Sequence, residues 1–108
     1  GVKQLEDFIY RAQNLWSQGL EDTALDLLYE ELAKLITSKD FQLIEQVLLD
    51  IDIKNLSENI IFALIIHAYS IRDQLPNYHK FFTKTLSHFE SQSDINQKWL
   101  EHYRKNFK

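Results

Sequence analysis

The sequence predicts an all-α protein of about six helices. Only two glycines and one proline occur among its 108 residues, too few for the many turns of a β-sandwich or a β-barrel. The apolar residues, 44% of the chain, recur at the three- and four-residue spacings of helical stripes. A chain of this length supports one hydrophobic core, so we expect residues 1–108 to form a single helical domain.

The first two helices are expected over residues 3–18 and from residue 21 to about residue 36. Gly19 separates them, because glycine readily takes the left-handed conformation that closes a helix. Glu21 and Asp22 then place negative charge at the positive end of the second helix dipole. The apolar stripes of the two helices are Leu5, Phe8, Ile9, Ala12, Leu15, Trp16, Ala24, Leu25, Leu28, Tyr29, Leu32, Leu35 and Ile36.

A third helix is expected from about residue 41 to residue 51, after a short corner at residues 37–40. Ser38 or Asp40 can cap it by accepting a hydrogen bond from a free backbone N–H. Its inward residues are Phe41, Ile44, Val47, Leu48 and Ile51. The following stretch DIDIKNLS, residues 50–57, is expected to be irregular, with its two isoleucines packed against the core.

The fourth helix, which Ser57 is expected to cap, differs from the others in being apolar on nearly all sides. Its apolar residues are Ile60, Ile61, Phe62, Ala63, Leu64, Ile65, Ile66 and Ala68. A helix of this kind is buried on several sides, so we expect it to be the central helix. The many β-branched residues make a buried strand the alternative, but a run of ten or more residues without glycine favours a helix.

The segment IIHAYSIRDQLPNYHKFF, residues 65–82, contains polar and aromatic side chains and the one proline of the chain. We interpret it as the corner between the fourth and fifth helices rather than as a site. Arg72 is expected to bond the last carbonyls of the fourth helix or to pair with an acid. Pro76 fits the first turn of the fifth helix, where its missing N–H costs nothing. Leu75 is expected to turn inward, and Tyr78 to cover the corner.

The last two helices follow the same apolar spacing. The break between them is SQSD, residues 91–94, and Asp94 with Gln97 three residues later nearly matches a capping box. The apolar residues of these helices are Tyr78, Phe81, Phe82, Leu86, Phe89, Ile95, Trp99, Leu100, Tyr103 and Phe107.

The segment LWSQGLEDTALDLLYEEL, residues 15–32, resembles the turn of a tetratricopeptide repeat. In that family a glycine closes helix A, an alanine five residues later packs helix B closely, and an apolar residue follows four further on. Gly19, Ala24 and Leu28 match those three positions. The resemblance implies a helical hairpin over this part of the chain.

A second segment, SKDFQLIEQVL, echoes the same turn, with Lys39 in place of the glycine and Ile44 in place of the alanine. The two turns lie about twenty residues apart rather than the roughly thirty-four of a true array, so the resemblance covers roughly residues 5–50 and implies one tetratricopeptide-like hairpin. Short corners also favour antiparallel neighbours. We therefore expect about six antiparallel helices packed as tetratricopeptide-like helical hairpins, with an orthogonal helical bundle as the alternative.

Residues 48–82 are also similar to small uncharacterised α-helical proteins of bacteria and their phages. The likeness rests on Leu56-Ser57, the apolar fourth helix, Arg72, Leu75-Pro76 and Phe81. It implies a helical fold and a prokaryotic setting, and it implies no known activity.

The sequence shows no catalytic constellation. Acid pairs such as Glu30 and Glu31 are expected to be solvated, whereas acid–base catalysis needs a carboxyl group in an apolar cleft. With two glycines in the chain, a phosphate-binding glycine loop is excluded. We therefore predict that the protein is not an enzyme and has no catalytic residues and no cofactor.

Metal binding is not predicted either. The chain has no cysteine, and its four histidines show none of the usual helix-borne ligand spacings. His67 lies inside the apolar fourth helix, where we expect a core or boundary residue with one hydrogen bond, although a buried ligand or base stays open. His79 is expected to face solvent.

The charge is divided unevenly along the chain. The net charge of −4 combines twelve acidic and five basic residues in residues 1–60 with four acidic and seven basic residues in residues 61–108. The last helix offers Lys98, Arg104, Lys105 and Lys108 beside aromatic rings, and Lys80 and Lys84 could join them. The alternative function is therefore that of a nucleic-acid-associated regulator, although the acidic sequence pI of about 5.5 counts against it.

The function we expect is non-catalytic protein–protein interaction, as an adaptor or regulatory module that binds another protein or a peptide. Stacked helical hairpins present grooves for peptides, and Tyr10, Asn14 and Gln18 are the candidate lining of such a groove. A homodimer through the fourth helix is possible if too few helices cover it. The longest apolar run is about half of the roughly twenty residues that span a membrane, so we expect no membrane partner. The absence of cysteine fits a reducing compartment, and we expect a cytoplasmic protein.

Overall fold

The computed structural model describes all residues, 1–108, and consists of six α-helices and two short 3₁₀ helices. The α-helices are α1 (Val2–Ser17), α2 (Glu21–Thr37), α3 (Phe41–Asp50), α4 (Glu58–Ser70), α5 (Tyr78–Glu90) and α6 (Gln97–Asn106). The 3₁₀ helices, η1 (Ile53–Asn55) and η2 (Arg72–Gln74), precede and follow α4. No strand is present, so the all-α class, the number of helices and the helical state of the apolar run are confirmed.

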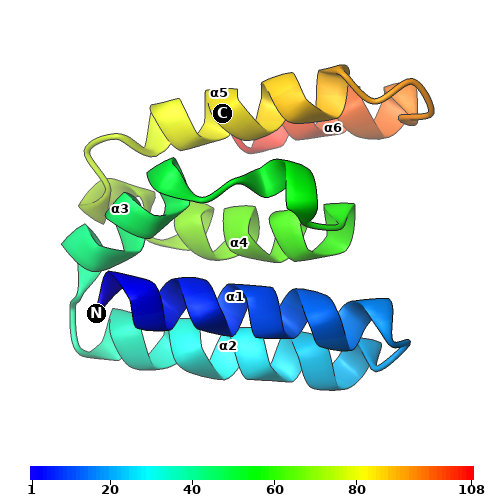
Figure 1. Cartoon of the computed structure of the whole chain (residues 1–108). Coiled ribbons are helices and arrows are strands. Elements are labelled where there is room, and N and C mark those ends of the chain that lie inside the picture. Colours follow the sequence, from blue (N-terminus) through cyan, green and yellow to red (C-terminus); the bar gives the residue numbers. More distant parts are fainter.

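The helices form three tiers of two (Figure 1). In the two outer tiers the chain runs out along α1 or α5 and back along α2 or α6 (Figure 1). In the middle tier α3 and the stretch after it lead out and α4 returns, so that α2, α4 and α6 all begin at the same end of the molecule. Across the tiers, α1 contacts α3 and α3 contacts α5, while α2 contacts α4. The result is a slab of 37 × 34 × 20 Å. The tetratricopeptide-like packing of these tiers stays a prediction.

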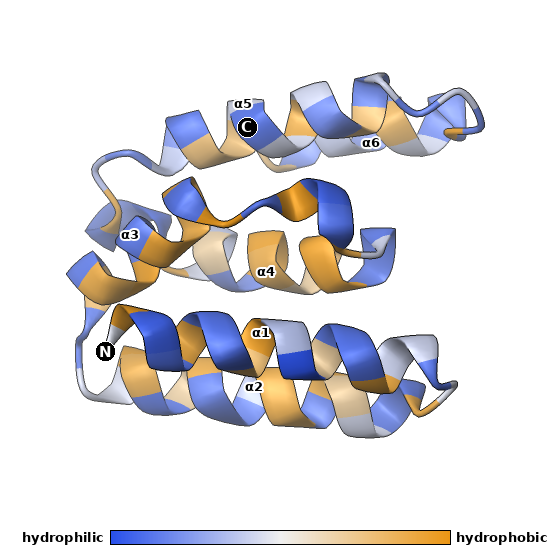
Figure 2. Ribbon diagram, in the orientation of Figure 1, coloured by the Kyte–Doolittle hydropathy of each residue, from blue (hydrophilic) through white to orange (hydrophobic).

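All six α-helices contribute to one cluster of 25 buried apolar residues. The buried residues of α4 are Ile60, Ile61, Ala63, Leu64, Ile65 and Ala68. This helix contacts α1, α2 and α5, and Figure 2 shows apolar colouring over most of its turns. Burying one such isoleucine or leucine stabilises the fold by about 1.5–3 kcal/mol. The expectation of a central, apolar fourth helix is confirmed.

The turns that end α1 and α2 have the same backbone. Gly19 has φ 83° and Lys39 has φ 61°, both in the left-handed region. In each turn this residue and the next donate N–H bonds to carbonyls three and five residues earlier, which closes the helix. The predicted role of Gly19 is confirmed. Lys39 takes the same conformation although its Cβ makes it costlier by about 1 kcal/mol.

The residues expected to cap α3 and α4 occupy the N-cap positions, but their side chains do not form the cap hydrogen bonds. The carboxylate of Asp40 instead accepts a hydrogen bond from the Ser38 hydroxyl, 2.6 Å away. The Ser57 hydroxyl is buried and has no partner. The backbone N–H of Ser57 donates to Oε1 of Gln13 on α1 at 2.7 Å. A contact from another helix thus satisfies the N–H of Ser57, and α4 has no side-chain cap.

The corner between α4 and α5 is built largely as expected. The Arg72 guanidinium donates to the carbonyl of Tyr69 at 2.9 Å and lies over its ring, 4.1 Å from the centroid, which realises the first of its two expected roles. Leu75 is buried. Tyr78 is buried too, and its hydroxyl donates to the carbonyl of Phe107, so it ties the chain terminus to the corner. Burial raises the pKa of Tyr78 to about 12.

Two predicted helix starts were wrong by two residues. Pro76 precedes the N-cap of α5, Asn77, instead of lying in the first turn. The helix begins later because Glu45 of α3 holds Asn77 through both its backbone and its side chain. The cap of α6 is Asn96, not Asp94: its Oδ1 accepts the N–H of Trp99 at 3.0 Å, so this neighbouring amide forms the cap bond instead.

Helices α3 and α5 are joined by charged side chains that bind backbone groups. Glu45 accepts hydrogen bonds from the N–H and the side-chain amide of Asn77, at 2.8 and 3.0 Å. In return, the Lys84 ammonium of α5 donates to the carbonyls of Leu48 and Leu49 at 3.1 and 2.9 Å, and also to that of Ile51. Burial lowers the pKa of Lys84. Each helix thus supplies the cap that the other lacks.

The irregular stretch after α3 is held as expected. Ile51 and Ile53 are both buried, so the two isoleucines do anchor it to the core. Asp52 accepts the backbone N–H of Lys54 at 3.1 Å and thereby caps η1.

The expectation of solvated acid pairs was wrong at one position. Glu30 is exposed, but Glu31 is only 8% exposed and lies among the buried residues of α2. Glutamate has good helix propensity, and its neighbours Leu28 and Leu32 place it beside the buried stripe.

None of the helices combines the length and the apolar composition needed to cross a lipid bilayer.

Candidate interaction surface

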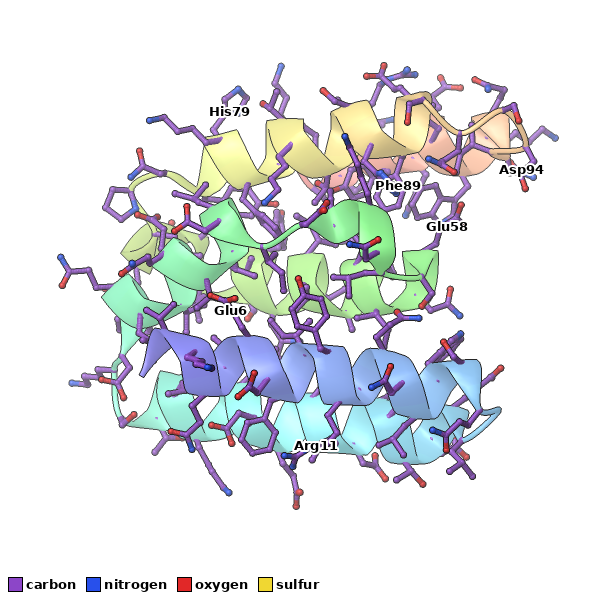
Figure 3. All side chains as sticks on the ribbon, viewed as in Figure 1. Glu6, Arg11, Glu58, His79, Phe89 and Asp94 are labelled. Atoms are coloured by element: carbon purple, nitrogen blue, oxygen red, sulfur yellow. The ribbon has the colours of Figure 1, made fainter.

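The titratable side chains are dispersed. No group of three histidine, aspartate or glutamate side chains is positioned to hold a metal ion. His79 is exposed and points away from the molecule, as expected (Figure 3). His67 is half-buried, and its Nδ1 lies 2.8 Å from the carbonyl of Ala63, one turn earlier in α4. It has the boundary position and the single hydrogen bond that the apolar context indicated.

The residues predicted to line a binding groove lie on α1 and at its C-cap. Tyr10 is half-buried, whereas Asn14 and Gln18 are exposed. They are spaced four residues apart, so they share one face of the helix. Their role in binding stays a prediction.

The largest exposed apolar side chains lie elsewhere. They are Leu20, Tyr29 and Ile66, which are 48%, 36% and 39% exposed. Leu20 belongs to the α1–α2 turn, whereas Tyr29 and Ile66 belong to α2 and α4, two helices in contact. Single exposed apolar residues are ordinary, but two on adjoining helices indicate an apolar surface.

This surface is the outer face of α4 together with one ring of α2. We call it the α4 surface and define it by Tyr29, Asn59, Phe62, Ile66, His67 and Tyr69. On the α2 side, the rings of Tyr29 and His67 pack with centroids 4.7 Å apart. On the α6 side, Phe62 packs against Trp99 and Phe107, at 5.7 and 5.4 Å. Ile66 lies exposed on the helix between these flanking rings.

The rings beside the α4 surface are fixed by contacts with α5 and within α6. Trp99 stacks on Tyr103 at 5.5 Å with an interplanar angle of 9°, and meets the edge of Phe89 at 4.9 Å. The Tyr103 hydroxyl bonds the hydroxyl of Thr85, which in turn donates to the carbonyl of Phe82. Burial raises the pKa of the Tyr103 hydroxyl well above its ordinary value. These contacts fix the indole in place without a ligand.

A cleft of about 450 Å³ opens at the end of the α4 surface where α4 and α6 begin. It is lined by Glu58, Asn59, Phe62, Asp94, Ile95, Asn96 and Trp99. Two smaller clefts lie at the α1–α2 turn, over residues 19–23, and between η1 and α5 beside Lys84. Because Lys84 is bound to three carbonyls, its ammonium is occupied and offers no reactive amine.

The basic residues of the alternative, nucleic-acid reading are not gathered into one free cluster. Arg104 is paired with Glu90 at 2.6 Å. Lys98 and Lys105 of α6 and Lys108 after it are exposed, and Glu101 is exposed on the same short helix as the first two. The suggestion that Lys84 could join them was wrong, because it caps α3.

No protein-family model, curated protein or solved structure matches this chain. The two resemblances drawn from the sequence therefore stay predictions.

The exposure of Tyr29 was missed because its spacing assigned it to an apolar stripe. That of Ile66 was missed because it belongs to a helix expected to be buried on several sides. The signal that could have found them is the composition of α4. A helix that is apolar on all sides needs neighbours on all sides, and the six helices do not supply enough of them.

Proposed function

We propose that this protein is a non-catalytic protein–protein interaction module and that the α4 surface binds its partner. One observation carries the proposal. Ile66 is 39% exposed on the most apolar helix, beside the packed rings of Tyr29 and His67. Because apolar area left in water is unfavourable by about 25 cal/mol per Å², a partner that covered this face would gain free energy at little cost in rearrangement.

The aromatic support of this face favours binding over simple exposure. Trp99, Tyr103 and Phe89 form a rigid layer beside Phe62. Rigid aromatic groups suit an interface because little side-chain entropy is lost when a partner covers them. The tiered arrangement also supports the tetratricopeptide-like reading, in which stacked hairpins present a surface to a peptide. We propose that arrangement along with the function.

Selection of peptides from a displayed random library against the whole chain tests the proposal. Peptides selected on the wild type should bind the Ile66→Asp variant at least tenfold more weakly, because a carboxylate is introduced at the centre of the surface. Leu20→Asp is the matched control, since Leu20 is equally apolar and even more exposed, at 48%, but lies in the α1–α2 turn. Thermal unfolding followed by circular dichroism confirms that both variants fold.

Three outcomes separate the alternatives. Equal loss of binding in both variants, or none in either, contradicts the assignment of the α4 surface. Loss of binding in Tyr10→Ala and Asn14→Ala variants instead would move the site to α1. Gel filtration at about 100 μM, a concentration at which weak self-association is detected, tests the third alternative. If the wild type elutes as a dimer and Ile66→Asp as a monomer, the partner is a second copy.

A further inference from the structure

The cleft at the start of α4 and α6 combines two carboxylates with aromatic walls. Glu58 is the first residue of α4, and Asp94 lies in the loop before α6. Figure 3 shows the two at the same end of the molecule, and both line the cleft of about 450 Å³ with Phe62 and Trp99. This is the one cleft of the chain that holds both kinds of group.

Both carboxylates are free of internal partners. The chain has one ion pair, and it joins Arg104 to Glu90, not to either residue of the cleft. Glu58 and Asp94 are both exposed. They are therefore available to an incoming group.

The sign of the charge in the cleft favours a cation. Helices α4 and α6 both begin here, and each helix start carries the equivalent of about half a positive charge. Two carboxylates outweigh two such partial charges, so the cleft is negative overall. An anion such as a phosphate group would be repelled by both acids.

The aromatic walls narrow the class of cation. Trp99 is fixed by Tyr103 and Phe89, and its ring meets that of Phe62 at 5.7 Å with the planes tilted by 60°. An indole is the best cation–π partner among the side chains. A guanidinium group is planar, can stack on a ring and can bond a carboxylate through two N–H groups at once.

We propose that this cleft binds an arginine side chain of the partner, an inference that rests on the proposed function of the α4 surface. The guanidinium lies against Trp99 and is neutralised by Glu58 and Asp94. Ile66 follows Phe62 by one helical turn, a rise of about 6 Å. In an extended peptide, side chains two residues apart lie about 6.6 Å apart on one face. The partner therefore places an apolar residue over Ile66, two positions from its arginine.

The test uses the pentapeptide acetyl-Gly-Arg-Ser-Leu-Gly-amide and its citrulline counterpart, which has the same shape without the charge. The indole N–H signals of the two tryptophans report binding by NMR. The Trp99 signal should shift on titration with the arginine peptide, and that of Trp16, on α1, should not. The citrulline peptide should bind at least tenfold more weakly.

Variants of the cleft complete the test. The pair Glu58→Gln and Asp94→Asn should weaken binding of the arginine peptide at least tenfold. The pair Asp7→Asn and Glu30→Gln is the matched control, because it removes two carboxylates that are also exposed, from α1 and α2. Equal binding of both peptides, or an equal loss in the control pair, overturns the proposal.

The inference and the proposed function fail separately. If the peptides selected on the wild type depend on Ile66 but contain no arginine, the α4 surface binds partners and the cleft does not bind arginine. If the arginine peptide shifts the Trp99 signal and no selected peptide depends on Ile66, the cleft is a cation site and the assignment of partner binding to the α4 surface is wrong.

Discussion

Helix α5 and the shared start of α4 and α6 use their polar side chains in opposite ways. Along α5, Tyr78, Lys84 and Thr85 all bond groups of other helices or of the chain terminus, and its N-cap is held by Glu45. At the start of α4 and α6, Glu58 and Asp94 are exposed without an ion pair. Polar groups that are satisfied inside the protein hold the fold together, and those left free are available to a partner. Changes in α5 should therefore alter stability, and changes in the cleft should alter binding.

The largest effect is expected from Lys84→Met. The substitution removes three hydrogen bonds from a charged donor and leaves the carbonyls at the end of α3 without partners, at a cost of about 3 kcal/mol in the free energy of unfolding. Urea unfolding measures it. Lys80→Met, an exposed change in the same helix, should cost less than about 0.5 kcal/mol. Similar values for the two variants would contradict the capping role.

The next effect concerns alkaline pH. Because the pKa of Tyr78 is raised to about 12 in the folded state against 10.0 for a free tyrosine, the folded chain keeps a proton that the unfolded chain releases. The contribution of Tyr78 to the free energy of unfolding is therefore fully present below pH 10. It should fall by roughly 2 kcal/mol as the pH rises toward about 12. In Tyr78→Phe the fall between these pH values should be smaller. An unchanged pH profile would contradict the buried state of this hydroxyl.

A smaller effect is expected in the turn at Lys39. Lys39→Gly should stabilise the protein by about 1 kcal/mol, because glycine takes the left-handed conformation without steric cost. The matched change Gly19→Ala should destabilise by a similar amount, since nothing but the backbone conformation opposes a Cβ there. Thermal unfolding of both variants measures the difference. Destabilisation by Lys39→Gly together with stabilisation by Gly19→Ala would mean that the entropy of the unfolded chain outweighs the strain of the left-handed residue.

The smallest effect is expected in the cleft. The double variant Glu58→Gln and Asp94→Asn should keep the wild-type free energy of unfolding within about 0.5 kcal/mol, because both residues are exposed and unpaired. Urea unfolding of the same protein used for the peptide titrations checks this. A loss of more than about 1 kcal/mol would mean that these carboxylates support the fold, and the contrast with α5 would disappear.

The basic residues of α6 offer a separate comparison with the cleft. With Arg104 paired to Glu90, we expect elution from heparin at low salt. Retention beyond about 0.3 M salt would indicate counterion release from several free cations and would favour the nucleic-acid alternative.

Much of the fold could be predicted because helix formation depends on residues that are close together in the sequence. The three- and four-residue spacing of apolar side chains predicted five of the helices, and a long apolar run without glycine predicted α4. Gly19 marked a turn that the structure confirms. The caps were predicted less well. Asp94 matched a capping pattern, but the neighbouring Asn96 forms the bond, because several amides and carboxylates in one loop can reach the same N–H groups.

The candidate site could be predicted only in part. Spacing placed Tyr29 on an apolar stripe, yet whether a stripe residue is buried depends on which helix covers it. The same is true of Glu31, whose charge indicated solvent and which is buried.

The sequence by itself determined that this chain forms about six helices, where each begins to within about two residues, and that the fourth lies in the core. The physical reason is that hydrogen bonds within a helix and the period of its stripe involve residues only three or four apart. The tertiary structure alone decided that Lys84 caps α3, that Glu45 holds the start of α5, and that Ile66 stays exposed. Those contacts join residues more than thirty positions apart, and they exist only because the tiers stack in this order.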